Sequence, residues 1–252
     1  RRVLIDRYFE GREVEVDAVC DGEEVLIPGI MEHIERAGGH SGDSMAIYPG
    51  LTLSKEEVDT IVDYTTRIGL ALEVQGLMNI QYVVVGGPAY RSPLADNGAD
   101  ALKTEVFVLE VNPRSSRTIP FISKVTGVPM VRLAVKAMLG TGLKEQGYEG
   151  GLWKKQKLVG VKAPVFSMSK LAGVDTYLGP EMKSTGEVMG IDFDFQGAVA
   201  KALLAGGMLF RSGDSVLLSI ADKDKVESLP LIRALVESDC KLYATEGTAA
   251  MV

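Results

Sequence analysis

The residues whose types and spacing favour chemistry are most concentrated in one run, Glu110-Val111-Asn112-Pro113-Arg114-Ser115-Ser116-Arg117. Side chains alternate along a strand, so Glu110 and Asn112 are expected to point to the same face. A carboxylate beside an amide supplies oxygen ligands for a hard cation such as Mg²⁺ or Mn²⁺, and Gln81 on a neighbouring strand would add a third. We therefore predict a divalent metal site at Gln81, Glu110 and Asn112.

Two arginines, Arg114 and Arg117, follow this predicted strand. Their guanidinium groups can hold phosphate oxygens through fork-like hydrogen bonds, which makes them the candidate catalytic residues. One carboxylate and two amides bind a cation weakly, so nucleotide phosphates would complete its coordination, and the run favours a site for metal-bound ATP. A single Glu-x-Asn match could equally be a strand end with solvated charges. Only its combination with Gln81 and the two arginines argues against that alternative.

A second candidate site is the segment from Ala37 to Ser44, which is too rich in glycine and small polar residues for a regular element. It is predicted to be a loop that presents backbone N–H groups to an anion. Within it, the His40 imidazole would hydrogen-bond a nucleotide or orient the backbone donors, whereas an isolated loop histidine would equally face solvent. His33 falls on a predicted apolar strand and is interpreted as structural.

Three acidic residues, Glu13, Glu15 and Asp17, alternate along the first predicted strand. Because they share one face, a carboxylate among them could accept hydrogen bonds from ribose hydroxyls. A polar face on an edge strand is the alternative interpretation.

The elements expected to position these residues begin with a hairpin, in which residues 13–20 and 24–30 have strand patterns around the turn pair Asp21-Gly22. Ser54 and Glu57 form a capping-box signature for a helix that ends before Gly76. The apolar side of this helix is predicted to comprise Val58, Ile61, Val62, Ile68, Leu70 and Leu72.

Further strands are predicted over residues 79–85 and 105–112, separated by a long polar loop. After Pro113 the pattern becomes helical, and Pro129 suits the first turn of a helix that runs to about Leu139 and stops at Gly140. Residues 142–190 show few long periodic runs, and residues 195–204 predict a short helix.

A second unit is predicted after Gly213. Residues 215–220 have a strand pattern, residues 222–237 a helix pattern, and residues 241–245 a second strand pattern. This order predicts a parallel α/β domain that is cut short. The chain begins with Arg1 and its last residues resemble the start of another helix, so both ends are expected to be cut from a longer chain.

The composition of the 252 residues, 46% hydrophobic and 24% charged, is that of an ordinary globular protein. A net charge of -7 argues against nucleic acid as a partner, because binding to a phosphate backbone requires excess Lys and Arg. With no run of about 18 apolar residues and no signal-peptide pattern, we expect no membrane association. Cys20 and Cys240 lack disulfide or metal spacing, which fits a reducing cytoplasm.

Several motifs in order resemble the large subunit of carbamoyl-phosphate synthetase. Besides the run from Glu110 to Arg117 they are Glu13-Val14-Glu15-Val16-Asp17, Ile30-Met31-Glu32-His33-Ile34-Glu35, His40-Ser41-Gly42-Asp43-Ser44 and Met78-Asn79-Ile80-Gln81. The segment Gly-Pro-Glu-Met-Lys-Ser-Thr-Gly-Glu-Val-Met-Gly, residues 179–190, is similar to the second ATP-grasp half of that subunit and not the first. The resemblance covers nearly the whole chain.

The resemblance implies an α/β fold in which an α+β ATP-grasp portion precedes a truncated parallel, Rossmann-like regulatory domain. Residues 1–140 would be the C-terminal part of the ATP-grasp domain and residues 141–212 the rest of the carbamoyl-phosphate synthetic half with its connector. Residues 213–252 would begin a methylglyoxal-synthase-like allosteric domain. The front of the ATP-grasp fold would be missing, so we expect this chain alone to be inactive.

In that family the second half phosphorylates carbamate with ATP, giving carbamoyl phosphate and ADP. The first half makes the carbamate from bicarbonate and ammonia, and a small glutamine amidotransferase subunit supplies the ammonia. The resemblance therefore implies a cytoplasmic, hetero-oligomeric ligase of pyrimidine and arginine biosynthesis that uses ATP with Mg²⁺ or Mn²⁺.

Site residues are also implied by the resemblance. Arg114 and Arg117 match arginines that stabilise the transferring phosphoryl group. The positions that match nucleotide contacts are Arg7, Phe9, Glu13, Gly38, Gly39, His40, Ser41, Gln81 and Glu110, and those that match metal ligands are Gln81, Glu110 and Asn112. The positions that match the site of a nucleotide effector of the UMP or IMP type are Ser219, Lys225, Thr245 and Thr248.

The sequence departs from the family pattern in two places, an insertion over residues 86–104 and Ala163, where ornithine-activated members carry Glu. The alanine counts against ornithine activation, although Glu35 and Asp43 match positions of that site. One alternative is another ATP-grasp carboxylate ligase, such as a biotin-carboxylase-like enzyme, which would share the Glu-x-Asn pair but not the segment 179–190. A second is a module that binds a nucleotide effector without turnover.

Overall fold

The computed structural model of the chain describes residues 9, 11–36, 38–86, 104–167, 178–208 and 211–250. Arg7 and most of the predicted insertion, residues 87–103, lie outside these ranges. The chain is α/β, as predicted, and forms two compact units: one holds the described residues up to Gly207, the other those from Met208 onward. Within the described ranges, no helix is long and apolar enough to cross a membrane.

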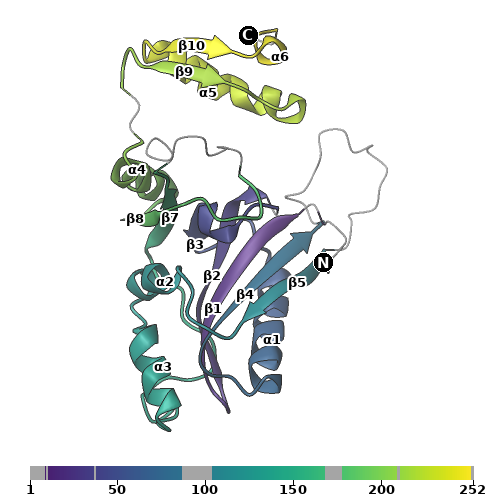
Figure 1. Ribbon diagram of the computed structural model, residues 1–252, viewed down its shortest axis with the longest axis vertical. Helices are drawn as coiled ribbons and strands as arrows, with labels where there is room; N and C mark the ends of the chain where they lie inside the picture. Colours follow the sequence, from purple (N-terminus) through teal and green to yellow (C-terminus); the bar gives the residue numbers. More distant parts are fainter. Residues whose placement is uncertain are drawn as a thin grey trace. The chain divides into compact units, whose positions relative to one another are not determined.

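The first unit is built on an eight-stranded sheet in the order β5-β4-β1-β2-β3-β7-β8, with β6 paired to β2 (Figure 1). Its strands are β1 (Arg12–Asp21), β2 (Val25–Arg36), β3 (Ala46–Tyr48), β4 (Gln75–Val85), β5 (Glu105–Asn112), β6 (Gly151–Leu152), β7 (Val159–Val165) and β8 (Gly186–Asp192). The predicted hairpin and the strands over residues 79–85 and 105–112 are confirmed. Strand β2 continues to Arg36 instead of Ile30, because β1 and β3 both pair with this extension.

Strands β6, β7 and most of β8 lie in residues 142–190, where the sequence shows few long periodic runs and no strand was predicted. Gly160 and Pro164 interrupt the apolar run of β7 and weaken its strand signal. The glycine has a packing reason: a Cβ at Gly160 would lie 2.4 Å from a Val125 methyl carbon and 2.9 Å from the Phe121 ring. Gly160, which weakens the strand signal of β7, is therefore also the residue that lets the helix carrying Phe121 and Val125 pack closely on this strand.

Helix α1 (Lys55–Ala71) covers one face of the sheet (Figure 1). The capping box predicted at its start is present, with both reciprocal bonds between Ser54 and Glu57. The prediction that Leu70 and Leu72 belong to its apolar side is wrong, since they are 38% and 56% exposed. The buried positions follow Ile61 at every fourth residue to Gly69, which turns Leu70 toward solvent.

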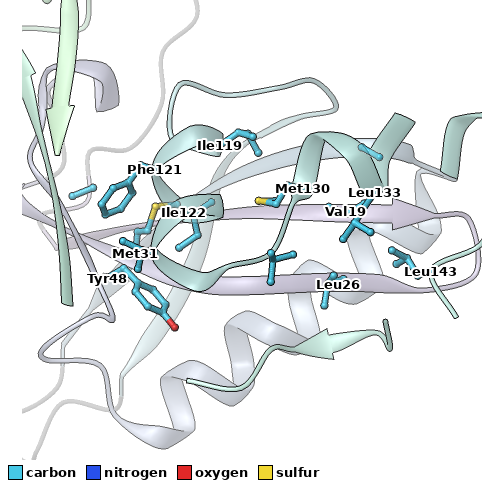
Figure 2. Close-up of a cluster of buried hydrophobic side chains, with 14 residues drawn as sticks. Val19, Leu26, Met31, Tyr48, Ile119, Phe121, Ile122, Met130, Leu133 and Leu143 are labelled. Carbon is cyan, nitrogen blue, oxygen red and sulfur yellow. The ribbon is translucent and has the colours of Figure 1, made fainter. Parts of the chain in front are cut away.

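Helices α2 (Ile119–Thr126) and α3 (Met130–Met138) cover the opposite face (Figure 1). Gly127, at φ 74°, ends α2 in the left-handed conformation, and Pro129 caps the start of α3, as its position predicted. Figure 2 shows their apolar side chains interlocked with those of the sheet; ten of the cluster are Val19, Leu26, Met31, Tyr48, Ile119, Phe121, Ile122, Met130, Leu133 and Leu143.

Helix α4 (Phe195–Ala205) packs on the far end of the sheet, against β7 and β8. The contact is closest at Gly190, where a Cβ would lie 2.0 Å from the carbonyl oxygen of Ala198.

The second unit contains β9 (Ser215–Leu218), α5 (Lys225–Glu237), β10 (Lys241–Ala244) and α6 (Glu246–Ala249). Strands β9 and β10 pair in parallel, which confirms the predicted strand–helix–strand order. The α-helix begins at Lys225 instead of Asp222, because residues 222–224 form a 3₁₀ turn.

Candidate functional site

The acidic residues of β1 lie in the middle of the sheet, because β1 pairs with β2 on one side and with β4 on the other. Glu13, Glu15 and Asp17 share one face and are only 2%, 3% and 0% exposed. The edge-strand interpretation is therefore wrong. Burying three carboxylates is costly, so the residues around them must supply positive charge and hydrogen-bond donors.

His33 on β2 supplies part of that compensation. Its Nε2 lies 3.1 Å from Glu15 Oε2 and its Nδ1 lies 3.4 Å from Glu13 Oε1, the second contact being too poorly aligned for a hydrogen bond. Burial raises the pKa of Glu13, against the attraction of His33. Burial would also raise the pKa of Glu15, but His33, Lys162 and Asn79 together hold it below its ordinary value.

Asp17 is tied to the segment that follows β5. Its carboxylate accepts hydrogen bonds from Asn79 Nδ2 at 2.9 Å, Ser116 Oγ at 2.6 Å and Thr118 Oγ1 at 2.5 Å. Burial and the neighbouring Glu15 raise the pKa of Asp17 to about 7, although the three donors oppose this. The two hydroxyl donors flank Arg117 in sequence, so the backbone on both sides of this arginine is anchored to β1.

The three predicted metal ligands are brought together at the edge of the sheet. Gln81 on β4 pairs directly with Glu110 on β5, and Asn112 Nδ2 donates to Glu110 Oε1 at 2.8 Å. Gln81 Nε2 donates to Ser41 Oγ at 2.6 Å. Each amide therefore uses its nitrogen on a protein acceptor, which leaves its carbonyl oxygen as the atom suited to a hard cation.

This donor set fits a cation that shares its coordination with a ligand. In the parts of the chain that the structure describes, no three or more His, Cys, Asp or Glu side chains are arranged to hold a metal ion by themselves. Glu110 is exposed, whereas Asn112 and Gln81 are half-buried. One carboxylate with two amide oxygens suits a divalent ion whose remaining ligands come from phosphate or water.

The glycine-rich segment forms the predicted loop and ends in a 3₁₀ turn over residues 41–43. Gly38 has φ 127°, which favours glycine, and a Cβ at Gly39 would meet no atom within 4 Å, so this backbone is open to a ligand. His40 Nδ1 accepts a hydrogen bond from Gly42 N at 3.0 Å. In its neutral form His40 therefore carries the proton on Nε2, where it can act as a donor.

The loop is held in place by the segment 178–186. His40 N donates to the carbonyl oxygen of Gly179 at 2.9 Å. The Asp43 carboxylate accepts from Lys183 N at 2.8 Å and from Ser184 N at 2.7 Å. Burial would raise the pKa of Asp43, but these bonds outweigh it and lower the pKa. Glu35, its partner in the predicted ornithine site, instead accepts from Met45 N at 2.7 Å.

The two candidate catalytic arginines are exposed and differ in their contacts. Arg117 Nη1 donates to Ser184 Oγ at 3.1 Å, which draws it toward the glycine-rich loop. Arg114 Nη1 donates to the neighbouring Ser115 carbonyl oxygen at 3.0 Å. Phe9 stacks on Phe107 of β5 with ring centroids 4.3 Å apart, and the structure does not describe Arg7.

Residues 1–146 match the family described as "Carbamoyl-phosphate synthase L chain, ATP binding domain". The chain belongs to this family. It is 58% identical over 249 residues to the carbamoyl phosphate synthase large chain of Thermomicrobium roseum, and 54% identical over 248 residues to that of Thermoanaerobacter pseudethanolicus. These alignments cover 99% and 98% of this chain but 22% of each relative, so the chain spans about a fifth of their length.

Solved structures support the fold assignment of this carbamoyl-phosphate synthase L chain segment. The biotin carboxylase domain of a single-chain bacterial carboxylase superposes with a TM-score of 0.55 at 15% identity, covering 80% of this chain and 46% of that one. N5-carboxyaminoimidazole ribonucleotide synthetase from Thermotoga maritima gives 0.53 at 13% identity, covering 81% and 53%. At these identities the likeness shows a shared fold.

Sequence reasoning missed one charged residue of the carbamoyl-phosphate synthase L chain site. Lys162 on β7 is 1% exposed and donates to the Ser41 carbonyl oxygen at 3.2 Å. A lysine inside the apolar run Val159–Val165 was the available signal. The next residue, Ala163, points to the opposite face and packs in the apolar cluster beneath α4.

Three of the predicted effector residues of the second unit, Lys225, Thr245 and Thr248, lie close together and are linked by hydrogen bonds to one another or to residues next to them in the sequence. Thr248 Oγ1 accepts from Ile220 N at 3.0 Å and from Thr245 Oγ1 at 3.2 Å. Lys225 Nζ donates to the Gly247 carbonyl oxygen and lies 2.6 Å from Asp222 Oδ1. These residues lie near the carboxyl ends of two parallel strands, where α/β domains bind ligands. Ser219 is exposed in the segment after β9.

Proposed function

We propose that the carbamoyl-phosphate synthase large chain carrying this sequence phosphorylates carbamate with ATP. A carbamate oxygen attacks the γ-phosphorus, a new P–O bond forms, and the bond to the β-phosphate oxygen breaks, leaving carbamoyl phosphate and ADP. The electron pair of the broken bond stays on ADP. Catalysis of such a transfer depends on alignment and on neutralising negative charge.

Different residues of this segment would align the reactants and neutralise the negative charge. Arg114 and Arg117 would hold oxygens of the transferring phosphoryl group, because their exposed guanidinium groups follow β5 beside the cation ligands. Gly38, Gly39, His40 and Ser41 would contact the nucleotide, and Glu13 its ribose. Gln81, Glu110 and Asn112 would hold Mg²⁺ or Mn²⁺, which when bound neutralises phosphate charge.

The observation that carries the proposal is the Gln81–Ser41 hydrogen bond of 2.6 Å. It joins the cation ligands of β4 and β5 to the open glycine-rich loop, which are far apart in the sequence. Metal-bound phosphate requires both within one site, because the cation must reach the same phosphates that the loop donors hold.

The test uses the full-length large chain and two measurements: calorimetric binding of ADP with Mg²⁺, and ATP synthesis from ADP and carbamoyl phosphate, the reverse of the proposed step. Glu110→Ala should abolish Mg²⁺-dependent ADP binding and ATP synthesis together. Glu105→Ala, an exposed carboxylate on the same strand, is the matched control and should leave both intact. Unchanged binding and synthesis in Glu110→Ala would show that Glu110 is structural and that the assigned site is wrong.

The wider assignment follows from the same proposal. A small glutamine amidotransferase chain would supply ammonia in a cytoplasmic hetero-oligomer that serves pyrimidine and arginine biosynthesis. The second unit would bind a nucleotide effector of the UMP or IMP type through Ser219, Lys225, Thr245 and Thr248. Ornithine would not activate this protein through Glu35 and Asp43, because Ala163 lies in an apolar cluster and Asp43 accepts two backbone donors. The domain limits proposed from the sequence are residues 1–140, 141–212 and 213–252.

A second candidate function is effector binding without turnover by these 252 residues alone. It is favoured by the clustering of Lys225, Thr245 and Thr248 at the strand ends of the second unit. Calorimetry of the isolated chain with UMP or IMP, in parallel with the ATP-synthesis assay, distinguishes the two functions.

A further inference from the structure

One hydroxyl joins the candidate catalytic Arg117 to the glycine-rich loop. Ser184 Oγ accepts a hydrogen bond from Arg117 Nη1 at 3.1 Å and donates one to the carbonyl oxygen of Gly42 at 3.0 Å. Ser184 is 5% exposed, whereas Arg117 is exposed. The buried hydroxyl is therefore a fixed point against which a long, flexible side chain is oriented.

Ser184 itself is fixed to the same loop by its backbone. The Asp43 carboxylate, 2% exposed, accepts from the backbone N–H groups of Lys183 and Ser184. At the other end of the segment, Gly179 accepts from His40 N. Residues 179–184 are thus bonded to the loop at both ends, so a displacement of the loop would be transmitted to Ser184.

The backbone of Arg117 is restrained independently. Ser116 and Thr118 on either side of it both donate to Asp17 on β1. These bonds fix where the arginine side chain begins but leave its guanidinium free to rotate. The hydrogen bond from Arg117 Nη1 to Ser184 Oγ directs the guanidinium toward the loop, and the half-buried Glu187 carboxylate adds an electrostatic attraction.

We propose that Ser184 is a positioning residue for phosphoryl transfer, which couples the glycine-rich loop to the orientation of Arg117. This inference rests on the proposed function, in which Arg117 holds the transferring phosphoryl group. Ser184 does not touch the nucleotide; it sets the guanidinium direction before the phosphoryl group arrives. Loss of its hydroxyl should therefore slow transfer much more than it weakens nucleotide binding.

The test compares Ser184→Ala with Ser184→Cys in the full-length large chain. Cysteine fills nearly the same volume but is a weak donor and acceptor, so it separates hydrogen bonding from packing. Both variants should lower kcat for ATP synthesis from ADP and carbamoyl phosphate by about tenfold to a hundredfold, the range for a bond to a charged group. The dissociation constant of Mg²⁺-bound ADP should change by less than about threefold in both.

Thr185→Ala is the matched control, because this neighbouring hydroxyl bonds to Val165 and Ser167 and not to Arg117 or Gly42. A second arm repeats Ser184→Ala in an Arg117→Lys background. If Ser184 acts through Arg117, the additional loss of kcat there should be under about threefold.

The outcomes separate this inference from the function on which it rests. A wild-type protein without ATP synthesis would refute the proposed function. With an active wild type, unchanged kcat in Ser184→Cys would refute the positioning role. Losses that add fully to those of Arg117→Lys, or ADP binding that weakens as much as kcat falls, would assign Ser184 a general structural role instead.

Discussion

His33 Nε2 lies 3.1 Å from Glu15 Oε2, and the imidazole side chain is entirely buried. The same ring faces Glu13 with its other nitrogen, so one histidine serves two buried carboxylates. This relationship explains how the centre of the sheet tolerates an acidic row: the imidazole attracts both charges, while Asn79 donates to Glu15 from β4.

Replacing that histidine should therefore loosen the centre of the sheet. His33→Leu leaves Glu13 and Glu15 buried without their shared partner, which should lower the opening free energy of β1 and β2 by about 3 kcal/mol. Hydrogen exchange of the β1 and β2 amides in the full-length protein measures this, and exchange should accelerate about a hundredfold. Adding Glu13→Gln to His33→Leu should restore part of the protection against exchange. Equal exchange rates in the wild type, His33→Leu and the double variant would contradict the electrostatic account.

Asp17 should make stability depend on pH in a direction opposite to the usual carboxylate. Its pKa is raised to about 7 from an ordinary value of 3.8, so the folded protein binds this proton more tightly than the unfolded chain. Stability from this group is therefore greatest at low pH and is lost as pH rises through the window between those values.

Asp17→Asn removes this titration together with the mutual repulsion of Asp17 and Glu15, whereas Asp43 titrates in both proteins. As pH falls from about 7 to about 5, the stability difference should shift toward the wild type by up to about 1.4 kcal/mol per pH unit. Urea midpoints at several pH values measure the shift. Parallel pH profiles for the two proteins would mean that Asp17 stays ionised when folded.

Much of the frame was predictable from local patterns. The strand alternation of β1, the capping box at Ser54 and the β-branched run of β5 are local signals, and each element lies where it was expected. The pairing of Gln81 with Glu110 followed from placing two strands side by side. The combination of ligand-type residues was visible because it depends on the spacing within β5 and on one neighbour.

The remaining features depend on contacts between distant parts of the chain. That β1 is central became clear only from its pairing with β4, some sixty residues later, so the acidic row could equally have been an edge. Asp43 matched an expected ligand position, yet its carboxylate bonds to residues 183 and 184. Strand β7 was missed because Gly160 serves packing against Phe121, a reason invisible in the local pattern.

The close packing of α4 on β8 can be tested by comparing two glycine-to-alanine variants. A Cβ at Gly190 would lie 2.0 Å from the Ala198 carbonyl oxygen, so Gly190→Ala must push α4 away from β8 and should cost about 2 to 3 kcal/mol. Gly179→Ala meets no atom within 4 Å and should change stability by less than about 0.5 kcal/mol. Urea denaturation of both variants checks this, and equal midpoints would contradict the close packing of α4.

Lys225 should decide whether the second unit binds a phosphate-bearing effector. Its ammonium group contacts Asp222 and the carbonyl oxygen of Gly247, next to the hydroxyls of Thr245 and Thr248. A phosphate bound there would gain a positive charge from the lysine and direction from the hydroxyls.

Lys225→Met removes the charge but keeps most of the side-chain volume, so UMP or IMP should bind about tenfold or more weakly by calorimetry. Lys241→Met, on the exposed side of β10, is the control for a general loss of positive charge and should leave binding unchanged. Because ATP synthesis depends on the first unit, Lys225→Met should retain wild-type rates without effector. Equal effector affinity in Lys225→Met and the wild type would place the effector site elsewhere.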